Sequence, residues 1–140
     1  MSGHDFRRNE SNAWDLQGRY ATDVFTEEAE SAIRNHDSRI GPLFLFLSHL
    51  AVHSGNQGKL LEAPQEDIDL FRHISDPNRR TYAAMMHRLD QSVGKVVRAL
   101  DATGMLSDSI IVFMSDNGAA TRGIFRNWGS NYPLRGVSTL

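Results

Sequence analysis

The chain has 140 residues, of which 40% are hydrophobic and 23% are charged, a composition typical of a globular protein and not of a disordered or fibrous one. Its 15 basic and 17 acidic residues leave a net charge of −2 with no concentrated basic stretch, which argues against a protein that binds nucleic acid. The absence of cysteine excludes disulfides, thiolate metal sites and cysteine nucleophiles.

Residues 1–18 show no apolar period and predict an irregular segment. Asn9 opens the triplet Asn-Glu-Ser, which matches the acceptor pattern for N-glycosylation. Such triplets also arise by chance, and residues 1–25 carry no secretory signal. Asn9 is therefore a candidate acceptor whose use depends on the compartment.

A first helix is expected to begin near Thr22 or Asp23, which are good N-terminal caps, and to end before Gly41. The next segment, 43–47, is apolar at every position. A run this short predicts a strand buried on both faces, as in parallel sheets that helices cover. This run is also too short to cross a bilayer. Residues 51–69, which follow it, predict a long loop.

The strongest helical pattern begins after Asp76 and Pro77 and ends at Thr103 and Gly104. A second buried strand is predicted over 110–114. The remaining residues, 119–140, predict a loop with three side chains as local anchors, namely Trp128, Tyr132 and Leu134.

Two apolar strands joined through a long helix predict a βαβ-like unit of an α/β sheet. Ligands of such sheets bind outside the carboxyl ends of the strands. Histidines follow the first strand (His49 and His53), and Asp116 and Asn117 follow the second. The sequence therefore predicts that these polar groups share one edge of the sheet.

The carboxylate of Asp116 and the amide of Asn117 are hard oxygen ligands suited to Ca²⁺ or Mg²⁺. The same sequence also suits a turn in which Asp and Asn bond their own backbone. His53 is placed to donate to an anion or to act as an acid or base, while a bond to a backbone carbonyl is the alternative. No role is assigned to His49.

Several segments in order resemble sulfatases of the arylsulfatase B group. The resemblance covers about residues 3–136 and is carried by the segments 20–29, 42–47, 51–53, 89–95, 115–118, 127–128 and 132–136. It implies an α/β, alkaline-phosphatase-like mixed sheet flanked by helices, in an enzyme that hydrolyses sulfate esters at one bound Ca²⁺. Asp116 and Asn117 would be metal ligands, and His53 would contact the substrate sulfate.

The nucleophile of the resembled family is a formylglycine made from a cysteine in a Cys-x-Pro-x-Arg motif, and this chain has neither. Two upstream Asp ligands of that family, and a Lys that follows its Pro-Leu-Arg-Gly motif, also have no counterpart. We therefore expect residues 1–140 to be part of one catalytic domain, truncated at both ends and inactive alone. The set of calcium ligands in this chain would be incomplete.

Two alternatives remain open. The chain could be a truncated, non-catalytic relative that acts as a binding or interaction protein. It could also be a phosphodiesterase or phosphonate hydrolase that uses Mn²⁺ or Zn²⁺, although Asn117 occupies the position where such sites add a His, and an amide oxygen suits Ca²⁺ better. The expected substrate is a sulfated small molecule or glycosaminoglycan, and the family implies a lysosomal or secreted glycoprotein.

Overall fold

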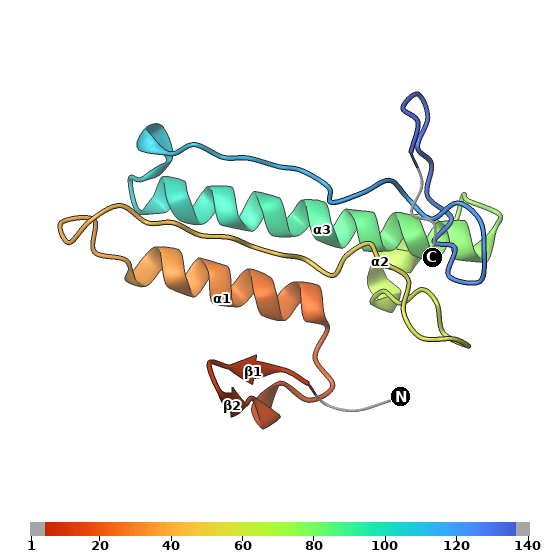
Figure 1. Cartoon of the computed structure of the whole chain (residues 1–140), viewed down its shortest axis with the longest axis horizontal. Coiled ribbons are helices and arrows are strands. Elements are labelled where there is room, and N and C mark those ends of the chain that lie inside the picture. The colour runs from red at the N-terminus through yellow and green to blue at the C-terminus, as the bar shows by residue number, and fades with distance from the viewer. Residues whose placement is uncertain (1–4, 137–140) are drawn as a thin grey trace.

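The computed structural model describes residues 5–136, and two long helices dominate it. Figure 1 shows these helices, α1 and α3, lying side by side and running in the same direction. The remaining elements are short. The elements in chain order are β1 (Arg7–Arg8), β2 (Ser11–Asn12), a 3-10 turn (Trp14–Leu16), α1 (Ala21–Asn35), α2 (Gln65–Leu70), α3 (Pro77–Ala102) and a second 3-10 turn (Leu106–Asp108).

The N-terminal residues form a small antiparallel hairpin, so the prediction of an irregular segment was wrong. Arg7 pairs with Asn12 and Arg8 with Ser11. Asn9 makes the tight turn with a φ of 52°, a left-handed conformation that Asn tolerates better than most residues. Strands of two residues are too short to show a period in the sequence.

The interface between α1 and α3 is built from small and β-branched residues. Ile33 of α1 and Ala84 and Ala99 of α3 are completely buried. α1 begins one residue after its N-cap, Tyr20, slightly earlier than predicted, so that Thr22 is part of the helix and is buried. Small side chains at the contact allow the two helix backbones to approach closely, and this fixes the positions of the loops attached to the helices.

The predicted ends of α3 are confirmed. The Asp76 carboxylate accepts a hydrogen bond of 2.8 Å from the backbone nitrogen of Arg79, and Pro77 occupies the first turn. Thr103 ends the helix, and Gly104 follows it with a φ of 72°.

All of α2 except its last residue lies in the segment 51–69 predicted as loop, so that prediction was wrong for residues 65–69. The helix has six residues, too few for an amphipathic period. It is tied to α3 by Arg88, whose Nε lies 2.8 Å from the buried carboxylate of Asp67 and whose terminal nitrogen lies 2.9 Å from Glu66. Arg88 Nε also lies 3.6 Å from Asp23 of α1, so one guanidinium joins all three helices.

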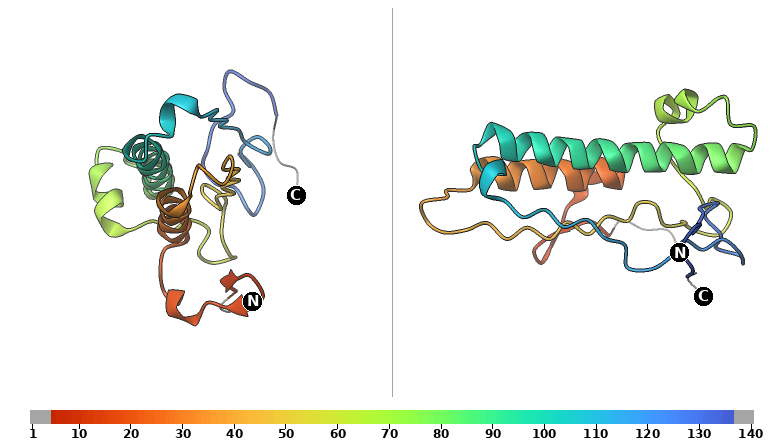
Figure 2. Two further views of the ribbon diagram at one scale, coloured as in Figure 1. Left: turned by 90° about the vertical axis from the view of Figure 1, so that its left-hand side faces the viewer. Right: turned by 90° about the horizontal axis from the view of Figure 1, so that it is seen from above.

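The two segments predicted as buried strands are extended but unpaired, and this is the main correction to the sequence analysis. Residues 42–50 and 109–116 run parallel to each other and opposite to the helices (Figure 1), and Figure 2 shows them as a layer beside the helices. Among residues 5–136, no strand forms a ladder with either segment. Most of their side chains are exposed, as at Phe44 (90%) and Ile110 (95%), while Leu43 and Leu47 are half-buried. A strand needs a neighbour for its backbone, whereas a helix bonds itself.

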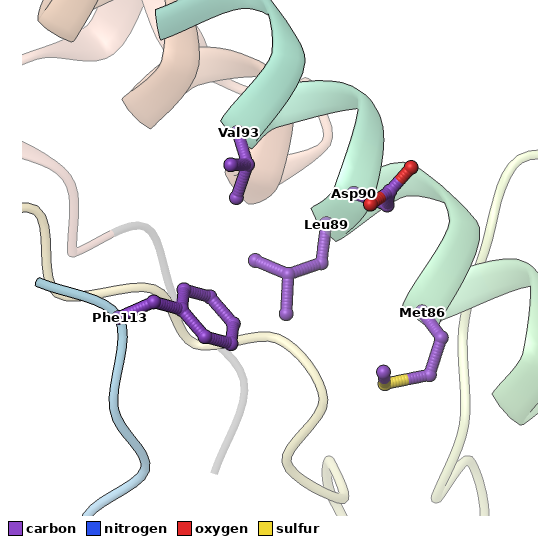
Figure 3. A pocket seen from close by; sticks show the side chains of 5 residues that line it. All are labelled: Met86, Leu89, Asp90, Val93 and Phe113. Atoms are coloured by element: carbon purple, nitrogen blue, oxygen red, sulfur yellow. The ribbon is translucent and has the colours of Figure 1, made fainter. Parts of the chain in front are cut away.

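One side chain of the second segment faces the helical layer. Phe113 lies across a hollow of about 260 Å³ from α3, and Figure 3 shows Leu89 and Val93 pointing toward it. The lining is almost entirely apolar, which identifies the hollow as a loosely filled contact between layers. Within the described residues, no helix is long and apolar enough to cross a membrane.

Candidate calcium and substrate site

The loops that follow the two extended segments meet at one end of the molecule, as the sequence predicted. Two hydrogen bonds join them. The Ser54 hydroxyl donates to the carbonyl of Phe125 at 2.7 Å, and Asn127 Nδ2 donates to the carbonyl of Val52 at 3.4 Å. The structure therefore brings the loop that carries His53 against the loop that follows Asp116 and Asn117.

The oxygens of Asp116 and Asn117 are available to a ligand. Both residues are exposed, and within residues 5–136 the Asp116 carboxylate has no hydrogen bond or ion pair. Asn117 donates from Nδ2 to the carbonyl of Gly118 at 2.8 Å, which leaves its Oδ1 free to bind a cation. The carboxylate oxygens of Asp116 and the amide oxygen of Asn117 are of the types that bind Ca²⁺. No group of three or more His, Cys, Asp or Glu side chains that could hold a metal ion occurs within the described residues, so Asp116 and Asn117 could supply only part of a metal site.

Gly118 is required here by close packing. A Cβ at this position would lie 2.6 Å from the carbonyl oxygen of Gly136 and 3.1 Å from Asn131 Oδ1. Asn131 in turn donates to the Ala119 carbonyl at 3.0 Å and accepts from the Ala119 nitrogen at 2.7 Å. The start of the loop after the candidate metal ligands is therefore hydrogen-bonded to its later part through Asn131.

His53 is exposed, and one of its ring nitrogens is engaged. Nδ1 lies 2.6 Å from the carbonyl oxygen of Ser54. Because a carbonyl only accepts, Nδ1 carries a proton, and in the neutral ring Nε2 is an acceptor. Nε2 can donate to an anion only when His53 is an imidazolium.

The loop segment that follows Asp116 is basic. Residues 117–136 contain three arginines and no acidic residue. These arginines, Arg122, Arg126 and Arg135, are exposed and form no ion pair within residues 5–136. Arg126 stacks 4.4 Å from the ring centre of Trp128, and Arg79 donates to the Trp128 carbonyl at 2.6 Å. The sequence analysis did not use the positive charge of this loop segment, although the sequence shows it.

The predicted anchors of this loop are corrected by the structure. Trp128 is partly buried, but Tyr132 is 91% exposed and Leu134 is 80% exposed. Instead of Tyr132 and Leu134, the loop is held by the buried side chain of Asn127 and by the hydrogen bonds of Asn131. Aromatic and aliphatic residues in a short loop indicate burial only when a core lies beneath them.

Comparison with known proteins decides the family. The Sulfatase family model matches residues 2–138. The chain belongs to the sulfatase family. Arylsulfatase J of Mus musculus is 40% identical over 138 residues, which are 97% of this chain and 21% of that protein. N-acetylgalactosamine-6-sulfatase of Rattus norvegicus is 30% identical over 113 residues, which are 81% of this chain and 20% of that protein.

A solved structure supports the same assignment. The crystal structure of Ps i-CgsB matches this sulfatase chain with a TM-score of 0.78 and 32% identity, covering 91% of this chain and 26% of that one. A second structure holds Ps i-CgsB in complex with k-i-k-neocarrahexaose. The neighbours are sulfatases of the alkaline-phosphatase-like fold, which confirms the coarse fold class, while residues 5–136 form a mostly helical part with only β1 and β2 as a paired sheet.

His49 of this sulfatase chain has a structural place that the sequence did not reveal. Its Nε2 lies 3.0 Å from the hydroxyl of Ser92 on α3, which lies 2.6 Å from the Thr26 hydroxyl on α1. Partial burial lowers the pKa of His49, because the interior disfavours the charged ring. The histidine thus links the first extended segment to both helices.

Proposed function

We propose that the polypeptide containing this chain is a calcium-dependent sulfuric ester hydrolase of the arylsulfatase B kind. The observation that carries the proposal is the meeting of two loops, one with His53 and the other following Asp116 and Asn117, in a chain of the sulfatase family. The oxygens of Asp116 and Asn117 and the imidazole of His53 would supply two metal ligands and a proton donor, while the nucleophile is not among these residues.

Each residue has a chemical role in the proposal. Asp116 and Asn117 would hold the calcium ion, together with ligands from outside this chain. When bound, the ion would neutralise sulfate oxygens. His53 would donate from Nε2 to an ester oxygen that gains charge as the bond breaks. The bond from Nδ1 to the Ser54 carbonyl orients the ring for that donation.

The basic loop segment supports a sulfated substrate, either a small molecule or a glycosaminoglycan. Arg122, Arg126 and Arg135 are free of ion pairs within residues 5–136 and would attract a polyanion. The stacked pair of Arg126 and Trp128 offers a flat face beside a charge, which suits a sulfated sugar ring. Raised salt would weaken this attraction by screening.

The 140 residues alone are proposed to be inactive. The family nucleophile requires a cysteine, and this sequence has none. A non-catalytic binding protein is the second candidate function, and the same missing cysteine favours it. Saturable binding of a sulfated oligosaccharide by a natural polypeptide that fails to hydrolyse an aryl sulfate would support that second function.

The decisive experiment measures turnover of a chromogenic aryl sulfate by the natural polypeptide that contains these residues. Chelation of calcium should abolish turnover, and Asp116→Ala should lower kcat/KM at least about 100-fold, because an essential ligand is lost. Asp101→Ala, at an exposed position of α3 without an ion pair within the described residues, is the matched control. Turnover that survives both chelation and Asp116→Ala would refute calcium dependence.

We also propose that Asn9 is glycosylated in a lysosomal or secreted protein. Asn9 is exposed at the tip of the β1–β2 hairpin, where an enzyme can reach it. Glycan removal should increase the electrophoretic mobility of the secreted protein, and Asn9→Gln should abolish that change. Asn12→Gln, three residues away and outside the acceptor triplet, should preserve it. An unchanged mobility of the unsubstituted protein would count against the site.

A further inference from the structure

We propose that Ser54 and Asn127 form a latch that positions His53 relative to the loop following the candidate metal ligands. The catalytic meaning of the latch rests on the proposed function. The two residues adjacent to His53 in the chain are both held. The carbonyl of Val52 accepts from Asn127 Nδ2 at 3.4 Å, and the hydroxyl of Ser54 donates to the carbonyl of Phe125 at 2.7 Å.

The burial of these polar side chains indicates a built contact. Ser54 is 8% exposed and Asn127 is 7% exposed, although His53 and Arg126 beside them are exposed. A buried polar group is costly unless it is bonded, and both side chains are bonded to backbone oxygens of the opposite loop. The hydroxyl of Ser54 and the Nδ2 of Asn127 therefore each spend their hydrogen bond on joining the two loops.

Asn127 uses both ends of its amide, which explains why the position requires this residue type. Oδ1 accepts from the Gly129 nitrogen at 3.0 Å within its own loop, while Nδ2 reaches Val52 in the other loop. The backbone nitrogen of Asn127 also donates to the Ala120 carbonyl at 2.9 Å. A carboxylate at this position could keep the first bond and could not donate the second.

The loop that carries Asn127 is itself anchored to α3. Arg79 donates to the Trp128 carbonyl at 2.6 Å. Gly129 is closely packed, since a Cβ there would lie 2.8 Å from the Ala119 Cβ and 3.0 Å from the Tyr82 hydroxyl. The latch thus connects the backbone on either side of His53 to α3 of the helical layer.

The ring of His53 depends directly on the latch as well. Its Nδ1 is bonded to the carbonyl of Ser54, the residue whose side chain closes the contact. Movement of the Ser54 backbone would therefore turn the imidazole as well as shift it. A displacement of about 1 Å in a reacting group can cost about 100-fold in rate.

The test uses matched variants in the natural polypeptide that contains these residues. Asn127→Asp keeps the acceptor for Gly129 and removes the donor to Val52, and Ser54→Ala removes the second bond independently. Ser54→Thr keeps a hydroxyl and should rescue function. Asn56→Asp, exposed and near His53, adds the same charge as Asn127→Asp without touching the latch.

Two readouts separate the latch from the proposed function. With an aryl sulfate, Asn127→Asp and Ser54→Ala should each lower kcat at least about 10-fold with KM changed less than about 3-fold, because His53 acts in the transition state. By hydrogen exchange, Ser54→Ala should raise the exchange rate of the Asn127 amide, in the opposite loop, about 10-fold. Ser54→Thr and Asn56→Asp should match the unsubstituted protein in both measurements.

The outcomes are distinguishable. An unsubstituted protein without turnover would refute the proposed function, while accelerated exchange of Asn127 in Ser54→Ala would still support the latch. Unchanged exchange of Asn127 in Ser54→Ala would overturn the latch, whether or not the protein hydrolyses sulfate esters. Turnover in Ser54→Ala and Asn127→Asp equal to that of the unsubstituted protein would overturn the positioning role.

Discussion

The two extended segments contain longer apolar runs than the amphipathic helices, yet their side chains are less buried. Ile33 of α1 is completely buried against its neighbours, whereas Ile110 of the second segment is 95% exposed. The helices satisfy their backbone bonds internally and need only side-chain packing from each other. The segments 42–50 and 109–116 need strands beside them, and residues 5–136 provide none.

This difference shows that hydrophobic pattern and burial are separate properties. An apolar residue is buried only when the chain brings another apolar surface to it. The polar loops at the ends of the same segments are nevertheless held together, because Ser54 and Asn127 bond across them. Four substitutions test this contrast, from the largest expected effect to the smallest.

Ile33→Ala should destabilise the helical layer most. The substitution removes a completely buried side chain between α1 and α3, which costs about 2–5 kcal/mol including the cavity left behind. Urea unfolding of the 140-residue chain, followed by circular dichroism, measures the change. Ile40→Ala, at a position 86% exposed, is the control. Equal losses in the two variants would contradict the described burial.

His53→Ala should impair activity without affecting the fold. Removing a proton donor to the leaving oxygen lowers kcat about 100-fold. The exposed side chain contributes little packing, so the free energy of unfolding should stay within about 0.5 kcal/mol. Steady-state kinetics with an aryl sulfate and urea unfolding, both on the natural polypeptide that contains these residues, measure the two effects. His73→Ala, also exposed, should preserve both quantities, and full activity of His53→Ala would exclude the proposed role.

His49→Gln should change how stability depends on pH. Burial lowers the folded-state pKa of His49, so the unfolded chain binds the proton more readily below about pH 6.5. The contribution of His49 to stability is therefore complete above that pH and is lost as the pH falls through the folded-state pKa. Gln can still donate to Ser92 but does not titrate in this range.

The measurement compares urea unfolding of the two proteins near pH 7.5 and near pH 5, on either side of the ordinary histidine pKa. The unsubstituted chain should lose more stability on acidification than His49→Gln. His73→Gln, at an exposed histidine, should behave like the unsubstituted chain. Identical acid sensitivity of all three proteins would show that His49 is not the responsible group.

Ile110→Ser should have the smallest effect. The side chain is 95% exposed, so its loss should change the free energy of unfolding of the 140-residue chain by no more than about 0.5 kcal/mol. Urea unfolding under the conditions used for Ile33→Ala measures it. A loss of several kcal/mol would mean that this segment is buried by a contact that the described residues do not show.

Much of the local structure could be predicted from particular residues. The cap at Asp76 and the terminator at Gly104 defined α3, and the apolar period located α1. The β1–β2 hairpin and α2 could not be predicted, because elements of two and six residues contain no full period. The meeting of the loop that carries His53 with the loop that follows Asp116 was expected from the order of the elements.

The sequence by itself determined the two long helices, the extended character of the apolar segments, and the membership of the chain in the sulfatase family through residues 2–138. These properties depend on local pattern and on residue identity. Only the tertiary structure decided that the segments 42–50 and 109–116 are exposed, that His49 reaches Ser92, and that Ser54 and Asn127 join the two loops. Residues far apart in the chain make these contacts, and a hydrogen bond between loops leaves no period in a sequence.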